Sequence, residues 1–222
     1  MNEQAAVVIG ASGLIGSHLV EQMLADDTFR TVRILVRKKL EPDHPKLEQQ
    51  VVDFNDVTDY ANKFGKGDSI FCCIGTTQKN VKGDKAAYEK IDHDIPVNAA
   101  AIGIANGYKK FLIVSSVGAD ASTSNFYLQL KGKIENALTQ FPFESISIFR
   151  PSMLLGNRKE KRPAEKIGQI LMQGFSFILV GSLKKYHPIK AKDVARAMIA
   201  ESKQGKPGIR ILEYKEMMAL LS

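Results

Sequence analysis

Cysteine is scarce in this chain of 222 residues: Cys72 and Cys73 are the only two, and they are adjacent. Neighbouring residues on a strand point to opposite faces, so the two sulfur atoms are poorly placed to bond to each other. The scarcity excludes a disulfide framework and is typical of a reducing cytosol. The paired spacing of a cysteine-based zinc site is missing too. We expect both side chains to be small buried hydrophobic groups in a cytoplasmic protein.

The sequence also shows neither the pattern of a leader segment nor an uninterrupted hydrophobic run of membrane-spanning length. The first predicted strand begins at Ala5, so we expect no signal peptide. The most apolar late stretch, Ile167–Leu183, is interrupted by glycine and glutamine and is too short and too polar to span a bilayer. We therefore expect no membrane span. A buried helix or a homodimer surface is favoured there, and the run Phe175–Val180 suits a hydrophobic lid or that dimer surface.

The sequence has little that points to a metal or to nucleic acid. Its four histidines are scattered without metal-ligand spacing, so no metal site is predicted. Lys and Arg number 31 against 24 Asp and Glu, which gives a net charge of +7. The densest basic cluster is Arg158–Arg162, and one such cluster is more typical of a solvated loop than of a nucleic-acid site. We do not expect nucleic acid as a partner.

Strand-like and helix-like segments alternate along the whole chain. The apolar strand runs are Ala5–Ile9, Thr31–Val36, Gln50–Val52, Ser69–Ile74, Lys110–Ser115 and Ser145–Phe149, with a short last strand near Ile209–Leu212. The helical segments are Leu14–Ala25, Asp84–Asn106, Phe126–Gln140, Ala164–Met172, Ala191–Ser202 and Tyr214–Leu221. Runs that are apolar on both faces suit a parallel sheet covered by helices on both sides. The alternation predicts a Rossmann-type, doubly wound α/β fold with a mostly parallel sheet.

A glycine-rich segment, Gly10-Ala11-Ser12-Gly13-Leu14-Ile15-Gly16, directly follows the first predicted strand. Glycine lets the backbone turn sharply and approach a ligand with no Cβ in the way. The helix that follows offers unpaired N–H groups and the positive end of its dipole to a phosphate. The strand before and the helix after are the context that a dinucleotide site requires. The segment predicts a pyrophosphate site; a ligand-free strand–helix turn is the alternative.

The ends of the next strands extend this site. An acidic residue after the second strand binds the ribose 2′-hydroxyl of NAD(H), whereas an arginine accommodates the 2′-phosphate of NADP(H). Arg37 and Lys38 stand there and favour NADP(H) over NAD(H), unless they form only a solvent-facing basic turn. Asp53-Phe54 after the third strand is placed to contact the adenine. Ile74-Gly75-Thr76 after the fourth offers a floor of small residues beneath the phosphates and ribose.

A tyrosine and a lysine lie four residues apart on the helix predicted after the fifth strand. Tyr127 and Lys131 at this spacing share a helix face. A neighbouring ammonium favours the phenolate form of a tyrosine, which makes the pair workable for proton transfer to a carbonyl or from an alcohol. Ser116, at the end of the preceding strand, is placed to bind the same substrate oxygen. Alone, such a pair is common on surfaces; beside the glycine segment it indicates a catalytic site.

Taken together, these motifs resemble an atypical short-chain dehydrogenase/reductase. The resemblance is carried by the glycine segment, Arg37, Asp53, Ser115-Ser116 and Tyr127-x-x-x-Lys131. More narrowly, three runs are similar to the Tat-interacting-protein family of NADPH-binding oxidoreductases, and they are Phe71-Cys72-Cys73-Ile74-Gly75-Thr76-Thr77, Ser115-Ser116-Val117-Gly118-Ala119-Asp120 and Phe149-Arg150-Pro151. The similarity also includes Tyr127–Glu135 and covers most of residues 5–200.

The resemblance implies roles for single residues. Tyr127 would be the proton donor or acceptor, Lys131 would bind the nicotinamide ribose and tune the tyrosine, and Ser116 would orient the substrate oxygen, with Ser115 as the alternative. The implied cofactor-binding residues are Gly10, Ser12, Gly13, Leu14, Ile15, Gly16, Arg37, Lys38, Asp53, Phe54, Ile74, Gly75, Thr76, Ser115, Tyr127, Lys131, Pro151, Met153, Leu154 and Arg162. The serine precedes the tyrosine by only eleven residues, slightly fewer than in the classical members, so the resemblance supports the role of the tyrosine more strongly than that of the serine.

The predicted protein is a single NAD(P)-binding domain over residues 1–222, in which about residues 150–222 supply substrate loops and helices. Its predicted activity is NADP(H)-dependent hydride transfer to or from a carbonyl or alcohol of unknown identity. The alternative is a catalytically weak NADP(H)-binding protein that acts as a redox-sensing regulator or a protein-interaction module.

Overall fold

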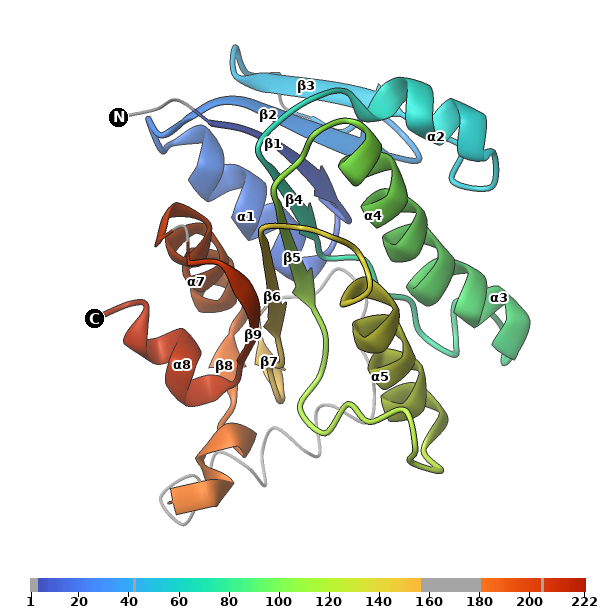
Figure 1. The fold of residues 1–222 in the computed structure, drawn as a ribbon, viewed down its shortest axis with the longest axis vertical. Coiled ribbons are helices and arrows are strands. Elements are labelled where there is room, and N and C mark those ends of the chain that lie inside the picture. Colours follow the sequence, from blue (N-terminus) through green and yellow to red (C-terminus); the bar gives the residue numbers. More distant parts are fainter. Residues whose placement is uncertain (1–3, 42, 157–180, 205) are drawn as a thin grey trace.

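A seven-stranded parallel sheet forms the centre of the molecule (Figure 1). The computed structural model describes residues 4–41, 43–156, 181–204 and 206–222. The strands, in the spatial order β3-β2-β1-β4-β5-β6-β9, are β3 (Leu47–Val51), β2 (Phe29–Val36), β1 (Gln4–Ile9), β4 (Ser69–Cys72), β5 (Lys110–Val114), β6 (Ser145–Phe149) and β9 (Gly208–Leu212). All neighbouring pairs are parallel. The Rossmann-type doubly wound sheet predicted from the sequence is confirmed.

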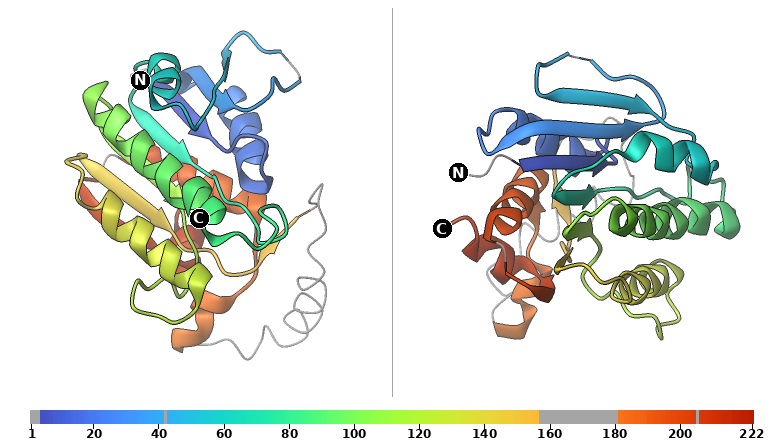
Figure 2. Two further views of the ribbon diagram at one scale, coloured as in Figure 1. Left: turned by 90° about the vertical axis from the view of Figure 1, so that its right-hand side faces the viewer. Right: turned by 45° about the horizontal axis from the view of Figure 1, so that its top comes forward.

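Helices cover both faces of the sheet, as Figures 1 and 2 show. One face carries α1 (Leu14–Leu24), α7 (Ala191–Gln204) and α8 (Tyr214–Ala219); the other carries α2 (Val57–Phe64), α3 (Lys85–Glu89), α4 (Ile95–Ala105) and α5 (Phe126–Leu138). Strand β1 packs against both helical layers, because its successive side chains point alternately to the two faces of the sheet. Ala6 and Val8 pack toward α1 and α7, whereas Val7 and Ile9 pack toward α2, α4 and α5.

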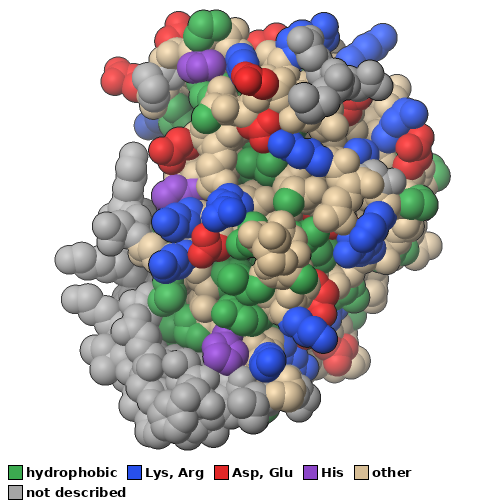
Figure 3. All heavy atoms as spheres, turned by 90° about the vertical axis from the view of Figure 1, so that its left-hand side faces the viewer, with side chains coloured by type: hydrophobic (Ala, Val, Ile, Leu, Met, Phe, Trp, Pro, Cys, Tyr) green, Lys and Arg blue, Asp and Glu red, His purple; other side chains and the backbone are tan. Residues whose placement is uncertain are grey.

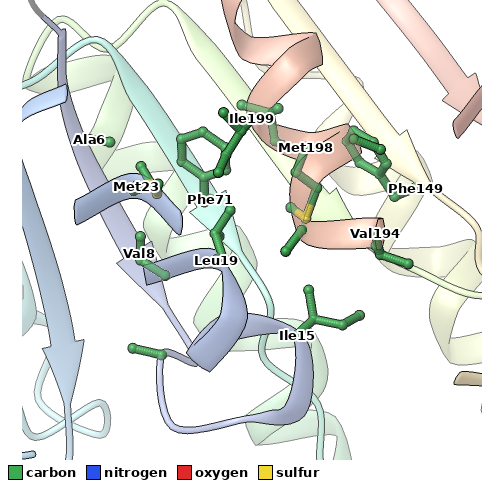
Figure 4. Close-up of a cluster of buried hydrophobic side chains, with 14 of the residues drawn as sticks. Ala6, Val8, Ile15, Leu19, Met23, Phe71, Phe149, Val194, Met198 and Ile199 are labelled. Carbon is green, nitrogen blue, oxygen red and sulfur yellow. The ribbon is translucent and has the colours of Figure 1, made fainter. Parts of the chain in front are cut away.

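The core on the α1–α7 face is continuous from strand to helix. Figure 4 shows Val8 of β1, Leu19 of α1 and Met198 of α7 directed toward one another around Phe71. Each of these four side chains is fully buried. Burying an apolar side chain of this size contributes roughly 1.5–3 kcal/mol, so α1 and α7 are held firmly on the sheet. The outer surface of this layer, seen in Figure 3, carries interspersed basic and acidic side chains.

The segment after β6 is held close to the glycine-rich turn. A short strand, β7 (Leu154–Leu155), pairs in parallel with β8 (Ile189–Lys190), which follows the 3₁₀-helix η3 (Gly181–Tyr186). A Cβ at Gly156 would lie 3.0 Å from Cδ1 of Leu14, the first residue of α1. The segment that follows β6 therefore reaches the start of α1, where the sequence predicts phosphate binding.

The predicted helix Asp84–Asn106 is wrong as a single regular helix. The structure has α3, a π-helical turn η1 (Lys90–Asp94) and then α4. Pro96 gives the physical reason, because it has no N–H to donate to the carbonyl of Asp92 four residues earlier, and its ring crowds that carbonyl. A π-helical turn before the proline contains one extra residue, which relieves the crowding and removes the need for the missing hydrogen bond.

Other boundaries differ from those predicted. The strand expected at Gln50–Val52 spans Leu47–Val51, and α2 was not predicted at all. The predicted helix Ala164–Met172, the basic cluster Arg158–Arg162 and the apolar run Phe175–Val180 lie outside the described residues. In the ranges that the structure does describe, no helix is both long and apolar enough to cross a bilayer.

The two cysteines face opposite layers of the fold, as predicted. Cys72, the last residue of β4, is fully buried toward α4 and α5, and burial raises the pKa of its thiol to about 12. Cys73 packs toward α1 and α7, with its sulfur 3.9 Å from that of Met198. The two sulfur atoms lie in different halves of the core, so they are not placed to bond to each other.

Candidate functional site

The glycine-rich turn connects β1 to α1 at the carboxyl end of the sheet, where β4 also ends. Gly10 has φ +86°, and a Cβ there would lie 2.7 Å from the carbonyl carbon of Cys73. A Cβ at Gly16 would lie 2.1 Å from the carbonyl oxygen of Gly10. The turn is closed by the N–H of Gly13, which donates to that same oxygen at 3.0 Å. Side chains at Gly10 and Gly16 would therefore clash with the backbone.

The first turn of α1 is open to an anion. Gly13 is the N-cap, and in the described structure no side chain caps this helix end. Ser12 and Gly13 are exposed, whereas Ile15 and Gly16 are buried. The side chain of Ile15 lies in the core, which leaves only its backbone to contact a ligand. Uncapped N–H groups at a helix start suit a phosphate, so this cradle fits the pyrophosphate of a dinucleotide.

The strand ends beside this cradle bring Arg37 and Asp53 to one shallow depression. Val51, Val52, Asp56, Asp59 and Lys63 complete its lining. Arg37 and Lys38 are exposed at the end of β2, and Asp53 is exposed after β3. The ring of Phe54 packs edge-on against that of Tyr60 at 5.0 Å, so it belongs partly to the core. The basic and acidic residues predicted to meet the adenosine half of the cofactor thus lie side by side.

Helix α5 holds Tyr127 and Lys131 together. The helix starts at an N-cap, Asn125, whose side chain accepts a hydrogen bond of 3.1 Å from the N–H of Leu128. Tyr127 is 38% exposed, whereas the Lys131 side chain is only 6% exposed. The Lys131 Nζ lies 5.9 Å from the centre of the Tyr127 ring. A phenol open to solvent therefore has a buried ammonium beneath it.

A buried carboxylate that sequence reasoning missed completes this pair. Asp92 Oδ2 lies 3.1 Å from Lys131 Nζ, and Asp92 Oδ1 accepts a hydrogen bond of 2.6 Å from the N–H of Thr76. A Cβ at Gly75 would lie 3.7 Å from Asp92 Oδ2 and 3.9 Å from Lys131 Nζ. The predicted cofactor floor, the π-turn and α5 therefore meet at one carboxylate. Pro96 was the signal in the sequence that could have located it.

The charge of Lys131 depends on these neighbours. Burial by itself lowers the pKa of its ammonium. The Asp92 carboxylate raises this pKa, and Tyr127 and Cys72 raise it further. The pKa of Lys131 consequently stands above its ordinary value. The group is positively charged at neutral pH although it is buried.

The two serines after β5 have different partners. Ser115 is buried, and its hydroxyl donates to Glu135 of α5. Glu135 also accepts from Nε of Arg150 at 3.0 Å, and this hydrogen bond raises the pKa of the Arg150 guanidinium. Within the described ranges, the hydroxyl of Ser116 donates one long hydrogen bond, 3.3 Å, to the carbonyl of Val117. Of the two serines, Ser115 is therefore the one tied to a buried side chain.

The segment that follows Arg150 lies beside this serine. The carbonyl oxygen of Pro151 accepts a hydrogen bond of 3.0 Å from the N–H of Val117, and the carbonyl of Met153 accepts one from Ile189. Leu154 packs against the core of the α1 face. The segment predicted to line the nicotinamide is thus tied to the end of β5. Arg162, predicted to reach the cofactor, lies outside the described residues.

Solved structures of an epimerase and of a dehydrogenase share the fold. A UDP-N-acetylglucosamine 4-epimerase from Methanobrevibacter ruminantium superposes with a TM-score of 0.70 at 18% identity, over 96% of this chain and 77% of that one. Uronate dehydrogenase from Agrobacterium tumefaciens gives a TM-score of 0.71 at 15% identity, over 96% and 76%. At these identities the likeness establishes the fold alone.

Three sequence relatives match over all or nearly all of the chain. Protein HTATIP2 from Rattus norvegicus is 34% identical over 100% of this chain and 89% of its own length. Protein FMP52 from Candida glabrata is 30% identical over 100% of this chain and 97% of its own length. A further FMP52, from Eremothecium gossypii, is 29% identical over 97% of this chain and 96% of its length.

These relatives overturn the expected cytoplasmic location. The FMP52 proteins of Candida glabrata, Eremothecium gossypii and Coccidioides immitis are all named as mitochondrial. The cytoplasmic prediction was wrong because it rested on the scarcity of cysteine. An absent disulfide framework indicates a reducing environment and does not identify a compartment.

Family membership follows from the extent of the sequence match. The model of a family described as NAD(P)H-binding matches residues 10–203, from the first glycine of the turn into α7. HTATIP2 from Rattus norvegicus and FMP52 from Candida glabrata, at 34% and 30% identity, each match over 100% of this chain. The chain therefore belongs to the NAD(P)H-binding family, in the group of atypical short-chain dehydrogenases/reductases that includes HTATIP2 and FMP52.

Proposed function

We propose that this protein is an NADP(H)-dependent oxidoreductase that acts on a carbonyl or an alcohol. The observation that carries the proposal is the pairing of exposed Tyr127 with buried, charged Lys131. The pair stands at the same end of the sheet as the uncapped glycine turn. This arrangement combines a dinucleotide cradle with a group able to transfer a proton.

The residues that would hold the cofactor lie on four successive strand ends. The backbone of the glycine turn would bind the pyrophosphate, Asp53 would contact the adenine, and Gly75 with Thr76 would lie beneath the ribose. When bound, the nicotinamide supplies or accepts the hydride. Ser116 would orient the substrate oxygen, and the segment from Pro151 to Leu154 would line the nicotinamide. Substrate contacts would come from about residues 150–222.

The proton step belongs to Tyr127. For reduction, its hydroxyl would donate to the carbonyl oxygen of the substrate as negative charge develops there, while Ser116 donates a hydrogen bond to the same oxygen. The Lys131 ammonium stabilises the phenolate that remains. For oxidation of an alcohol, the same groups act in reverse. A positioned general acid of this kind contributes typically ~10²–10⁴-fold to the rate.

A preference for NADP(H) over NAD(H) is supported by the charge at the end of β2. Arg37 and Lys38 are both exposed there, and Arg37 lines the same depression as Asp53. A guanidinium binds phosphate oxygens in a bidentate manner, so Arg37 would pair with the 2′-phosphate that NADP(H) has and NAD(H) lacks.

The substitution Tyr127→Phe tests the proposed activity. The variant should bind NADPH as the wild type does and lose turnover on a panel of aldehydes and ketones. Lys131→Met should lose turnover too, whereas Lys133→Met, which changes an exposed lysine on the same helix, should retain it. A wild type that reduces no carbonyl of the panel, or a fully active Tyr127→Phe, would refute the proposal. Partner binding that requires NADPH would then favour the regulator or interaction module.

A further inference from the structure

The connection from β4 to α3 carries three lysines to which the proposed function gives no role. They are Lys79, Lys82 and Lys85, and all three are exposed. We propose that this lysine loop, residues 77–85, binds an anionic group of the substrate, so that the carbonyl or alcohol compound carries a carboxylate or a phosphate. The inference rests on the proposed function, because it names the substrate class of the same site.

The lysine loop begins at the predicted cofactor floor and ends beside Tyr127. Its first end is fixed because the carbonyl oxygen of Thr76 accepts a hydrogen bond of 3.0 Å from the Tyr88 hydroxyl. At its other end, Nζ of Lys85 lies 5.3 Å from the centre of the Phe126 ring. Phe126 directly precedes Tyr127 at the start of α5. The loop therefore connects the residues expected to meet the cofactor with the tyrosine expected to transfer a proton.

Hydrogen bonds and one apolar side chain hold the loop in a compact conformation. The N–H of Gly83 donates to the carbonyl of Gln78 at 2.9 Å, and the N–H of Asn80 donates to the carbonyl of Thr77 at 3.0 Å. Val81 is partly buried against the core on the α5 side of the sheet. Because the backbone is fixed before a ligand binds, binding costs less conformational entropy than it would on a free chain.

The charge of the lysine loop is positive. Its one acidic residue, Asp84, is the N-cap of α3, and its carboxylate accepts hydrogen bonds from the N–H groups of Ala86 and Ala87. Within the residues that the structure describes, none of the three lysines forms an ion pair with a carboxylate. Ammonium groups without a counter-charge raise the local concentration of anions and speed their association.

The backbone of Lys82 is strained. Its φ is +51°, and in the described ranges no other residue apart from glycines has a positive φ. The left-handed conformation brings Cβ close to the backbone, so glycine and asparagine are the residues usual there. A lysine that keeps this conformation retains an ammonium in the loop at a cost in stability, and strain of this kind is typical of functional sites.

The phosphates of the cofactor have binding groups elsewhere. The pyrophosphate would lie at the start of α1, which follows β1, and the 2′-phosphate beside Arg37, which follows β2. The lysine loop follows β4, which lies on the opposite side of β1 from β2, and it contacts α5. An anion bound by its lysines therefore belongs to the substrate and not to the cofactor.

Three aldehydes that differ in one substituent test the inference. 4-Formylbenzoate carries a carboxylate, 4-formylphenyl phosphate carries a phosphate, and methyl 4-formylbenzoate is uncharged. Their dissociation constants are measured by isothermal titration calorimetry in the presence of NADP⁺, which cannot reduce an aldehyde. The variants are Lys82→Asn and Lys85→Met. Lys66→Asn is the matched control, because Lys66 is an exposed lysine that precedes β4 and so stands at the opposite end of that strand.

The wild type should bind at least one of the anionic aldehydes about tenfold more tightly than the neutral ester, because a hydrogen bond to a charged group is stronger than one to a neutral group. The tighter of the two identifies the anion as carboxylate or phosphate. Lys82→Asn and Lys85→Met should each reduce this preference several-fold, and added KCl should reduce it in the wild type by screening. Lys66→Asn should keep the wild-type preference.

Equal affinity of the wild type for the three aldehydes, or an unchanged preference in Lys82→Asn and Lys85→Met, would show that the inference is wrong. It is wrong as well if these variants weaken NADPH binding and leave the preference intact, because the lysines then serve the cofactor. Lys82→Asn should fold, since asparagine adopts a positive φ more readily than lysine does, and urea unfolding checks this.

The proposed function and this inference fail in different ways. A wild type that reduces no carbonyl refutes the proposed function. The affinities for the three aldehydes are measured without turnover, so they still decide whether the lysine loop binds an anionic group.

Discussion

Among single residues, Gly13 and Gly16 of the turn after β1 should differ in what they contribute: Gly16 to the stability of the fold and Gly13 to NADPH binding. A Cβ at Gly16 would lie 2.1 Å from the backbone oxygen of Gly10, whereas a Cβ at Gly13 has its nearest neighbour at 3.2 Å. Gly16→Ala should therefore cost about 1–3 kcal/mol of unfolding free energy, since only a backbone shift relieves the overlap. Gly13→Ala should cost less than about 1 kcal/mol.

For NADPH affinity we expect the opposite order: Gly13→Ala should weaken binding more than Gly16→Ala. Gly13 is exposed at the uncapped start of α1, so its new methyl group would stand where the pyrophosphate approaches. Urea unfolding and NADPH titration of both variants check the two effects. A Gly13→Ala protein that binds NADPH as tightly as the wild type would contradict the placement of the phosphates.

The buried Glu135 makes a second prediction for a single residue. It accepts hydrogen bonds from Ser115 after β5 and from Arg150 after β6, and its side chain is 6% exposed. Glu135→Ala leaves the Arg150 guanidinium without its anion and should cost about 3 kcal/mol in urea unfolding. Glu144 pairs with Lys109, both 62% exposed, so Glu144→Ala is the control and should cost less than about 1 kcal/mol. Equal costs for the two variants would show that the buried network contributes nothing.

At the level of elements, the strands were predictable and some helices were not. Buried parallel strands are continuous apolar runs, which is why β1, β2 and β5 were located from the sequence. Helix α2 buries only Tyr60 and Phe64 and has low apolar content, so periodicity did not reveal it. Its signal was the N-cap Asp56, whose side chain accepts from the N–H groups of Thr58 and Asp59.

The candidate site was predictable only as far as local motifs extend. The glycine turn and the Tyr127–Lys131 spacing are patterns within seven and five residues, and the structure brings those residues together. Asp92 meets Lys131 across 39 residues of chain, and no local pattern encodes such a contact. The pairing also depends on a π-turn, which follows from Pro96 but was hidden by a strong helical pattern on either side of it.

Close packing of α5 against the preceding loop gives a prediction for that element. A Cβ at Gly132 would lie 2.2 Å from the backbone nitrogen of Ala121 and 2.4 Å from the carbonyl carbon of Asp120. Gly132→Ala should push the loop away from the helix and lower the unfolding free energy by about 1–3 kcal/mol. Lys133→Ala, at the exposed neighbouring position, should change it by less than about 0.5 kcal/mol. Urea unfolding compares them, and equal stability of the two variants would exclude this contact as a constraint.

At the scale of the whole molecule, the strand order explains why the glycine turn and the ends of the neighbouring strands lie at one end of the sheet. Strand β1 has β2 on one side and β4 on the other, so the chain reverses its direction of travel across the sheet at that point. In doubly wound sheets ligands bind outside the carboxyl ends of the strands at such a reversal. The glycine turn and Gly75-Thr76 follow the two strands on either side of it.

Cofactor binding at that crevice should stabilise the whole fold. A ligand present at a hundredfold excess over its Kd adds about 2.7 kcal/mol to the unfolding free energy, if it binds only the native state. For a chain of this length each kcal/mol raises Tm by about 2–4 °C, so saturating NADPH should raise Tm by about 5–10 °C. Thermal unfolding with NADPH and with NADH at equal concentration measures the effect.

The difference between the Tm increases caused by NADPH and by NADH tests whether the basic residues at the end of β2 bind the 2′-phosphate. If Arg37 pairs with the 2′-phosphate, NADPH should raise Tm more than NADH does, and Arg37→Ala should bring the two values together. Lys39→Ala removes an equal charge from a residue that lines a different depression, beside Leu40 and Gln49, and should leave the difference intact. A wild type stabilised equally by both cofactors, or more by NADH, would mean that the basic strand end faces solvent and selects nothing. The result distinguishes a specific phosphate contact from the general attraction of a protein with a net charge of +7 for any dinucleotide, because that attraction would weaken about equally in both variants.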